Sequence, residues 1–271
     1  MNITNTLILV PFDFMPMSYQ ALEHGAYMAK AMEQKLMLLH ITDKDSAIPA
    51  LEKKLQLIVE ECAENYGITP EFMIRKGNYP YAIIKDVAME LNPKLVILKT
   101  GGVKGIRRYT GIRTIKILSG SVVPFVVIQD APAGPLLQNI VFPINFLEQH
   151  DTKLKRVVFF SLFYPDATMH IITPSGKDTE KEKIIATDIK VMTKALEDRQ
   201  IKVKFILHDK KKNTAEDILL IARKANADMI MTPMEKVSTL SKFLFGLREE
   251  KLISNAEKIP VMCVHSDSDV L

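Results

Sequence analysis

Cysteine is scarce in this chain of 271 residues, which holds only Cys62 and Cys263, one in each half. Both lie in apolar or helical surroundings and no Cys-x2-Cys pair is present, so neither a disulfide scaffold nor a cysteine metal site is indicated. We expect two structural thiols in a reducing compartment. Because no signal peptide is recognisable, the expected location is the cytoplasm.

Long apolar runs and a strong charge of either sign are also missing. The longest apolar stretches have the length of a strand, so no membrane span is expected. A net charge of +4 is nearly balanced and does not indicate nucleic acid as a partner. The six histidines lack the spacing of metal ligands, and there is no full Walker A loop, no Ser/His/Asp order and no carboxylate pair. We therefore expect a protein that is not an enzyme.

The chain does contain a repeat. Residues 8–14 read Ile-Leu-Val-Pro-Phe-Asp-Phe, and residues 140–146 read Ile-Val-Phe-Pro-Ile-Asn-Phe. The ends of the halves match as well, since Val-Pro-Phe-Val-Val-Ile at 123–128 is followed by Ile-Pro-Val-Met-Cys-Val at 259–264. Matches at both ends with similar spacing predict the duplication of a whole domain of about 130 residues.

The predicted domains are residues 1–130 and 139–271, joined by a linker at 131–138 that begins in a stretch with Pro132 and Gly134. With 47% hydrophobic and 25% charged residues, the chain has enough apolar material for two globular cores.

Strand and helix patterns alternate through both halves, and the first strand, 7–12, is an apolar run typical of burial on both faces. In the first half we predict strands at 7–12, 35–42, 71–76, 95–98 and 124–128, and helices at 18–33, 48–66, 81–91 and 112–119. In the second half we predict strands at 140–144, 167–173, 202–207, 228–232 and 260–265, and helices at 148–163, 179–199, 214–225 and 248–256.

This alternation predicts the α/β class, with two tandem, doubly wound, Rossmann-like domains of five parallel strands each. The fifth strands, 124–128 and 260–265, are apolar edges that need to be covered. We predict that they pair with each other in an intramolecular pseudo-dimer. A homodimer is a further form of self-association that this edge allows.

Several short motifs occur in a characteristic order. Val10-Pro11-Phe12-Asp13-Phe14 closes the first strand, and Leu38-Leu39-His40-Ile41-Thr42 closes the second. Gly77-Asn78-Tyr79-Pro80 precedes a helix, and the fourth strand runs into a glycine-rich loop. In this order, in both halves, the chain resembles a tandem member of the universal stress protein family. The resemblance implies the strand order 3-2-1-4-5, dimerisation through the fifth strand and, in some members, binding of an adenine nucleotide.

The nucleotide-binding members carry Gly-x2-Gly-x9-Gly-[Ser/Thr] between the fourth strand and the fourth helix, where glycines let backbone N–H groups approach phosphate. This chain has Leu98-x2-Gly101-x9-Gly111-Ile112, or in a shifted register Lys99-x2-Gly102-x8-Gly111. In either register the first glycine is replaced and Ile112 stands where the hydroxyl would be. The phosphate motif is half present.

Basic residues crowd this loop, and charge-assisted hydrogen bonds to phosphate are stronger than neutral ones. One well-placed arginine, such as Arg113, could offset the lost hydroxyl. Alternatively, the basic side chains form a solvated loop and helix face. The residues concerned are Lys99, Lys104, Arg107, Arg108, Arg113 and Lys116.

Asp13 follows the first strand at the carboxyl edge of the sheet, where ligands of doubly wound folds bind. The resemblance implies that Asp13 contacts the adenine side of the nucleotide, with Pro11 beside it and the backbone of Ile41 at the end of the second strand. The alternative is that Asp13 is a turn or helix-capping residue.

The second half lacks most of these features. Asn145 replaces the aspartate, and the loop reads Pro233-Met-Glu-Lys236-x9-Gly246-Leu247, with one glycine of three. Proline lacks the N–H that a phosphate site needs. We predict that the second copy keeps the fold without the pocket.

The leading hypothesis is thus a cytoplasmic, non-catalytic stress-response module that binds ATP or another adenine nucleotide weakly in its first domain. A ligand-free module that presents surfaces to protein partners has the same fold and is the main alternative. A slow nucleotide hydrolase ranks last, because no general base is evident. No metal is expected.

Overall fold

The computed structural model describes residues 7–100, 123–144, 166–174, 179–208, 214–234 and 242–265, together with residues 154, 157, 158, 161 and 164. The chain divides into two compact units. Residues 1–136 and 233–268 make up the first unit, and residues 137–232 and 269–271 make up the second.

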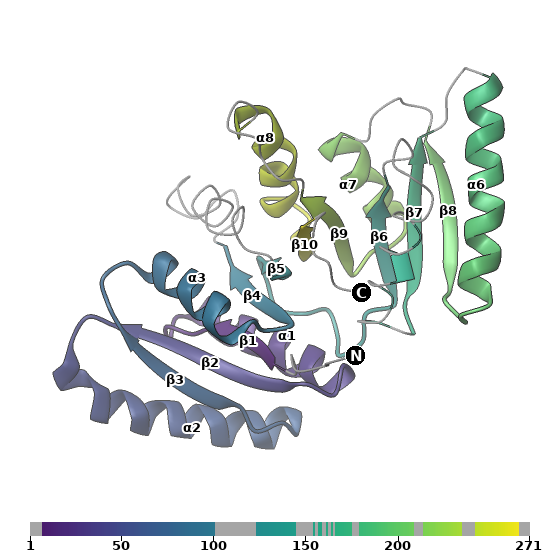
Figure 1. The fold of residues 1–271 in the computed structure, drawn as a ribbon. Coiled ribbons are helices and arrows are strands. Elements are labelled where there is room, and N and C mark those ends of the chain that lie inside the picture. Colours follow the sequence, from purple (N-terminus) through teal and green to yellow (C-terminus); the bar gives the residue numbers. More distant parts are fainter. Residues whose placement is uncertain are drawn as a thin grey trace. The chain divides into compact units, whose positions relative to one another are not determined.

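The first unit holds a sheet with α-helices on both faces. Its strands are β1 (Leu7–Pro11), β2 (Lys35–Thr42), β3 (Glu71–Lys76), β4 (Leu95–Lys99), β5 (Phe125–Ile128) and β10 (Val261–His265). Its helices are α1 (Pro16–Ala31), the 3-10 turn η1 (Asp45–Ala47), α2 (Ile48–Tyr66), α3 (Pro80–Leu91) and α8 (Lys242–Ile253). Figure 1 shows α3 in front of the strands and α1 behind them.

The strand order of the first unit is β3-β2-β1-β4-β5-β10, and the strands β1 to β5 are parallel. The order 3-2-1-4-5 implied by the family resemblance is confirmed. The centre of the sheet is apolar without alternation, since Ile8, Leu9 and Val10 of β1 are all fully buried. This is the pattern of a strand covered on both faces.

Local sequence signals explain where the helices begin and end. Pro16 occupies the first turn of α1, where its missing N–H has no cost. Gly67 ends α2 in the left-handed conformation, with φ 69°, and donates its N–H to the carbonyl of Ala63. A glycine in this conformation is a common end of a helix, because it has no side chain to clash there.

The last strands of the two repeats pair with each other. β10 runs antiparallel to β5, with Val261 opposite Val127, Met262 opposite Val126 and Cys263 opposite Phe125. All of these side chains are buried. The predicted pairing of the fifth strands is confirmed, and in the first unit β10 covers the edge that β5 would otherwise expose.

The second unit repeats the topology of the first four strands. Its strands are β6 (Asn139–Pro143), β7 (Thr168–Pro174), β8 (Val203–His208) and β9 (Met229–Met234), and its described complete helices are α6 (Thr179–Glu197) and α7 (Ala215–Lys224). The order is β9-β6-β7-β8, with parallel pairing of β6 to both β7 and β9 and of β7 to β8.

Two predicted features of the second repeat were wrong. Gly246 and Leu247 were assigned to a loop, but they lie inside α8, which begins at Lys242 rather than at 248 and ends at Ile253 rather than at 256. A helix tolerates an internal glycine at a cost of about 1 kcal/mol, so the glycine was no reliable loop signal. Pro233 was also assigned to the loop, but it lies within β9.

Other predictions fall partly or wholly outside the described residues. The helix at 112–119 lies outside them, and of the helix at 148–163 the described positions 154, 157, 158 and 161 are helical. The predicted linker 131–138 contains neither helix nor strand. The domain limits 1–130 and 139–271 stay predictions, and the two compact units follow a different division, with residues 233–268 in the first. Among the described helices, none is both long enough and apolar enough to cross a membrane.

Candidate functional site

The sheet of the first unit reverses its winding between β1 and β4. Strand β1 pairs with β2 on one side and with β4 on the other. Asp13 follows the carboxyl end of β1, and Lys99 is the last residue of β4. The two residues therefore lie at the edge and at the switch point where doubly wound folds bind their ligands.

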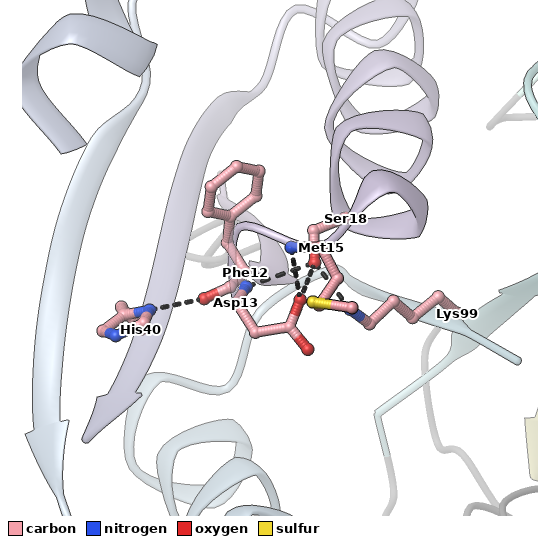
Figure 2. Close-up of polar contacts among 6 residues, drawn as sticks. All are labelled: Phe12, Asp13, Met15, Ser18, His40 and Lys99. Carbon is pink, nitrogen blue, oxygen red and sulfur yellow. Dashed lines mark hydrogen bonds and ion pairs between the residues drawn. The ribbon is translucent and has the colours of Figure 1, made fainter. Parts of the chain in front are cut away.

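Asp13, Ser18 and Lys99 form one hydrogen-bonded cluster at this edge (Figure 2). The ammonium of Lys99 donates to Asp13 Oδ1 and, over 2.7 Å, to Ser18 Oγ. The Ser18 hydroxyl donates to the same Asp13 Oδ1 over 2.5 Å. Figure 2 shows the second carboxylate oxygen of Asp13 pointing away from these donors.

The same cluster shapes the turn between β1 and α1. The backbone N–H of Met15 donates to Asp13 Oδ1 over 3.1 Å, and the backbone N–H of Asp13 donates to Ser18 Oγ over 3.1 Å. A bond from an aspartate oxygen to the N–H two residues later is an Asx turn. The turn alternative for Asp13 is therefore borne out, whereas Met15 takes the N-cap position of α1.

The environment of Asp13 favours its ionised form. Its side chain is 54% exposed, against 26% for Lys99. Partial burial raises the pKa of the carboxyl, but hydrogen bonds from Lys99 and Ser18, the charge of Lys99 and the N–H of Met15 outweigh this and lower the pKa below its usual value. The edge thus carries a carboxylate and an ammonium in contact.

Aromatic side chains pack against the turn between β1 and α1. His40 in β2 is buried, and its Nδ1 lies 2.8 Å from the carbonyl oxygen of Phe12. The Phe14 ring lies 5.0 Å from the His40 ring and 5.2 Å from the Phe12 ring, between centroids. Phe14 has a φ of 61°, a left-handed conformation that costs a residue with a side chain roughly 1–2 kcal/mol. These contacts hold the residue after Asp13 in place.

The predicted site residues fall into two groups. Pro11 ends β1 opposite Leu39, and Ile41 lies near the end of β2 opposite Arg75, so both reach the edge that carries Asp13. Both are half-buried. The loop residues Gly101, Gly102, Gly111, Ile112 and Arg113 lie outside the described residues, as do the other basic residues of the loop after Lys99.

The roles of Ser18 and Lys99 were not predicted from the sequence. Ser18 is fully buried in the first turn of α1, and Lys99 was grouped with the basic loop rather than paired with Asp13. The position of Lys99 could have been predicted, because a residue at the end of a central parallel strand lies at the carboxyl edge of the sheet. That its partner is Asp13 could not be predicted, since Asp13 follows another strand, β1, and the strand order does not give the contacts of side chains.

A second cluster at the first unit's edge joins α1 to the end of β5. His24 is buried, its Nε2 lies 3.1 Å from the carbonyl oxygen of Asp130, and its burial lowers its pKa to about 4. Gln20 donates to Asp130 Oδ1, and Lys258 lies 2.6 Å from Asp130 Oδ2. A histidine held neutral and buried in this way has a structural role.

The corresponding edge of the second unit is described only in part, since Asn145 and Lys236 lie outside the described residues. At the start of α7, Thr214 and Asp217 form a capping box, which stabilises the first turn of the helix. His208, at the end of β8, lies 3.4 Å from Asp217 Oδ2. Within the described residues of the whole chain, no group of three metal-ligating side chains comes together.

Comparison with known proteins decides the family. The sequence model of the universal stress protein family matches residues 5–129 and, a second time, residues 138–265. The chain belongs to the universal stress protein family. It is a tandem member with two copies of the family domain, as the repeat predicted. No curated protein matches the sequence significantly.

Solved structures show the same fold over nearly the whole chain. This universal stress protein is similar to one from Archaeoglobus fulgidus, with 19% identity and a TM-score of 0.73 over 97% of this chain and 99% of that one. A functionally unknown protein from Pseudomonas aeruginosa PAO1 has 16% identity and a TM-score of 0.67 over 98% of this chain and 94% of its own. At such low identity, the likeness extends to the fold alone.

Proposed function

We propose that this universal stress protein is a non-catalytic regulatory module whose first repeat binds an adenine nucleotide, such as ATP, at the carboxyl edge of β1 and β4. One observation carries the proposal: the Asp13 carboxylate and the Lys99 ammonium meet at the switch point of the sheet. An acceptor and a cation side by side suit a ligand that has both amine or hydroxyl donors and an anionic group.

Each member of the proposed site has a chemical task. Asp13 Oδ2 would accept a hydrogen bond from the ligand, while Pro11 and the backbone of Ile41 would line the base. Gly101 or Gly102, together with Gly111, would offer backbone N–H groups to phosphate, and Arg113 would add charge. Ile112 has no hydroxyl to contribute, which removes one bond.

Weak affinity follows from the same geometry. Asp13 Oδ1 is already occupied by Ser18, Lys99 and the N–H of Met15. A ligand gains only from the remaining acceptor capacity or has to displace one of these donors, which lowers the net gain per hydrogen bond. We expect dissociation constants in roughly the micromolar-to-millimolar range.

The Asx turn favours a second candidate function, a ligand-free module that presents surfaces to protein partners. In that case the cluster of Asp13, Ser18 and Lys99 has only to connect β1 to α1 and β4. The fold is identical in both cases, so binding measurements have to decide. A cytoplasmic location and a homodimer also stay predictions.

Titration calorimetry with ATP, ADP and AMP tests the leading proposal. We expect heat of binding for the wild-type protein and its loss in Asp13→Ala. Asp45→Ala is the matched control, because Asp45 is also an exposed carboxylate paired with a lysine, Lys76, over 2.5 Å. If millimolar nucleotide gives no heat, or if Asp13→Ala binds like the control, the proposed site is wrong.

A phosphate-release assay tests the non-catalytic part of the proposal. Incubation of the protein with ATP should release no more phosphate than buffer does. Release that depends on protein concentration and persists through further purification would favour the nucleotide hydrolase instead.

A further inference from the structure

In the candidate site, the positive charge of Lys99 offsets the negative charge of the Asp13 carboxylate, at the switch point of the sheet. We infer that Lys99 determines the charge of the ligand that this edge accepts, and that it selects a phosphate-bearing nucleotide over the neutral nucleoside. This inference rests on the proposed function and specifies its ligand class.

The contacts of Ser18 show why the selection would depend on Lys99. Its hydroxyl oxygen accepts from Lys99 and from the backbone N–H of Asp13, and its proton is donated to Asp13 Oδ1. The hydroxyl thus uses its donor and both acceptor positions within the protein. Because Ser18 is also fully buried, it has nothing to offer a ligand.

Lys99 differs from Ser18 in both respects. Two of the three N–H donors of its ammonium are used in the described contacts, with Asp13 and Ser18, and a quarter of its side chain is accessible. The four-carbon stem is flexible, so the ammonium can reach a phosphate oxygen at the same edge and stay near the carboxylate. A charge-assisted bond to phosphate is among the stronger hydrogen bonds.

The charge of Asp13 supplies the other half of the argument. Its carboxyl is ionised and half-exposed, with a pKa held below the usual range by its donors. Without Lys99, a bare negative charge would face any incoming phosphate and repel it. A neutral nucleoside would meet no such repulsion, and Asp13 Oδ2 would still accept its hydrogen bond.

Calorimetric titration of Lys99→Met with ATP and with adenosine at one fixed ionic strength tests the inference. We expect the affinity for ATP to fall about tenfold, equal to about 1.4 kcal/mol, and that for adenosine to change less than about threefold. Lys99→Arg, which keeps the charge, should keep most of the preference for ATP. Should Lys99→Met fail to fold, as judged by its thermal transition, Lys99→Gln replaces it.

Lys35→Met is the matched control, because Lys35 is also an ion-paired lysine, 3.2 Å from Glu71. It begins β2, at the opposite end of the strands from Asp13, so its loss should leave both affinities unchanged. An effect of equal size in this control would mean that net charge alone steers ATP, and would overturn the inference.

The other outcomes separate the inference from the proposed function. If Lys99→Met loses ATP and adenosine equally, or keeps the wild-type ratio of affinities, the inference is wrong and the proposed function stands. If neither the wild type nor Lys99→Met binds ATP or adenosine, both are wrong.

Discussion

The imidazole of His40 donates a hydrogen bond through Nδ1 to the main-chain carbonyl of Phe12, over 2.8 Å. Because a carbonyl oxygen can only accept, Nδ1 carries the proton. The bond joins His40, near the carboxyl end of β2, to the residue that follows β1, next to Asp13. The N–H of Phe12 in turn donates to the carbonyl of Leu39 over 2.8 Å. Both the N–H and the carbonyl of Phe12 are therefore hydrogen-bonded to residues of β2.

Replacing His40 should therefore destabilise the first unit. In His40→Ala the Phe12 carbonyl loses its side-chain partner and the Phe14 ring loses one of its two ring neighbours, so we expect a loss of about 2–4 kcal/mol in the free energy of unfolding. His40→Asn should recover part of this loss, because its amide can donate to the same carbonyl. Urea unfolding measures both, and equal stability of His40→Ala and wild type would contradict the assignment.

Asp13 should make stability depend on pH in the acid range. Its pKa is lower in the folded protein than in the unfolded chain, so its contribution is complete above the unfolded value of about 3.9. That contribution is lost as the pH falls through the lower folded value. The stability difference between wild type and Asp13→Asn should shrink from pH 6 to pH 3 in denaturant titrations. A difference that is constant over this range would refute the ion pair.

Gly25 in α1 lies where a larger residue does not fit. A Cβ at this position would lie 2.8 Å from Val10 Cγ2 and 3.0 Å from Leu36 Cδ1. Overpacking of a core costs about 1–3 kcal/mol, against a gain of about 1 kcal/mol in helix propensity. Gly25→Ala should thus lose about 1 kcal/mol, the middle of a net range of about 0–2 kcal/mol, in thermal or urea unfolding.

Gly134 provides the control for this substitution, since a Cβ there would meet nothing within 4 Å. Gly134→Ala should change the stability by no more than about 0.5 kcal/mol. A Gly25→Ala variant as stable as Gly134→Ala would show that β1 and β2 can move aside.

Both cysteines should resist thiol reagents in the native protein. Cys62 on α2 is buried, which raises its pKa to about 11, and Cys263 on β10 is fully buried with its pKa raised further. At pH 8, labelling with a disulfide reagent should be at least about a hundredfold slower than in guanidinium, because the thiolate is the reactive form. Labelling of Cys263 at the rate of the unfolded chain would mean that the pairing of β5 and β10 opens readily.

The strands and several helices could be predicted because their signals are local. The predicted bounds of β2, α2 and β3, at 35–42, 48–66 and 71–76, are those observed. Continuous apolar runs flanked by turn residues explain the strands, and a left-handed glycine explains the end of α2. The prediction for α8 was wrong because Gly246 is a weak local signal, and the packing of a helix can outweigh it.

The candidate site could be predicted only by position. Asp13, Pro11 and Ile41 were expected at the carboxyl edge, and the strand ends bring them there. That Lys99 holds Asp13 was not predicted, because a strand order that makes β1 and β4 neighbours does not say which side chains meet at the strand ends, and 86 positions separate the two residues. Ser18 was missed for the same reason, since its task depends on where Lys99 reaches.

The sequence by itself determined the repeat, the alternation of strands and helices, and the residues that end each strand, because these depend on composition and on spacing along the chain. Only the tertiary structure decided that Asp13 is held by Lys99 and Ser18, that Asp130 joins His24 to Lys258, and that the predicted pair of β5 and β10 is antiparallel and in this register. Such contacts arise when strands distant in the sequence become neighbours in the sheet, and which side chains then meet depends on the register of those strands and on their packing.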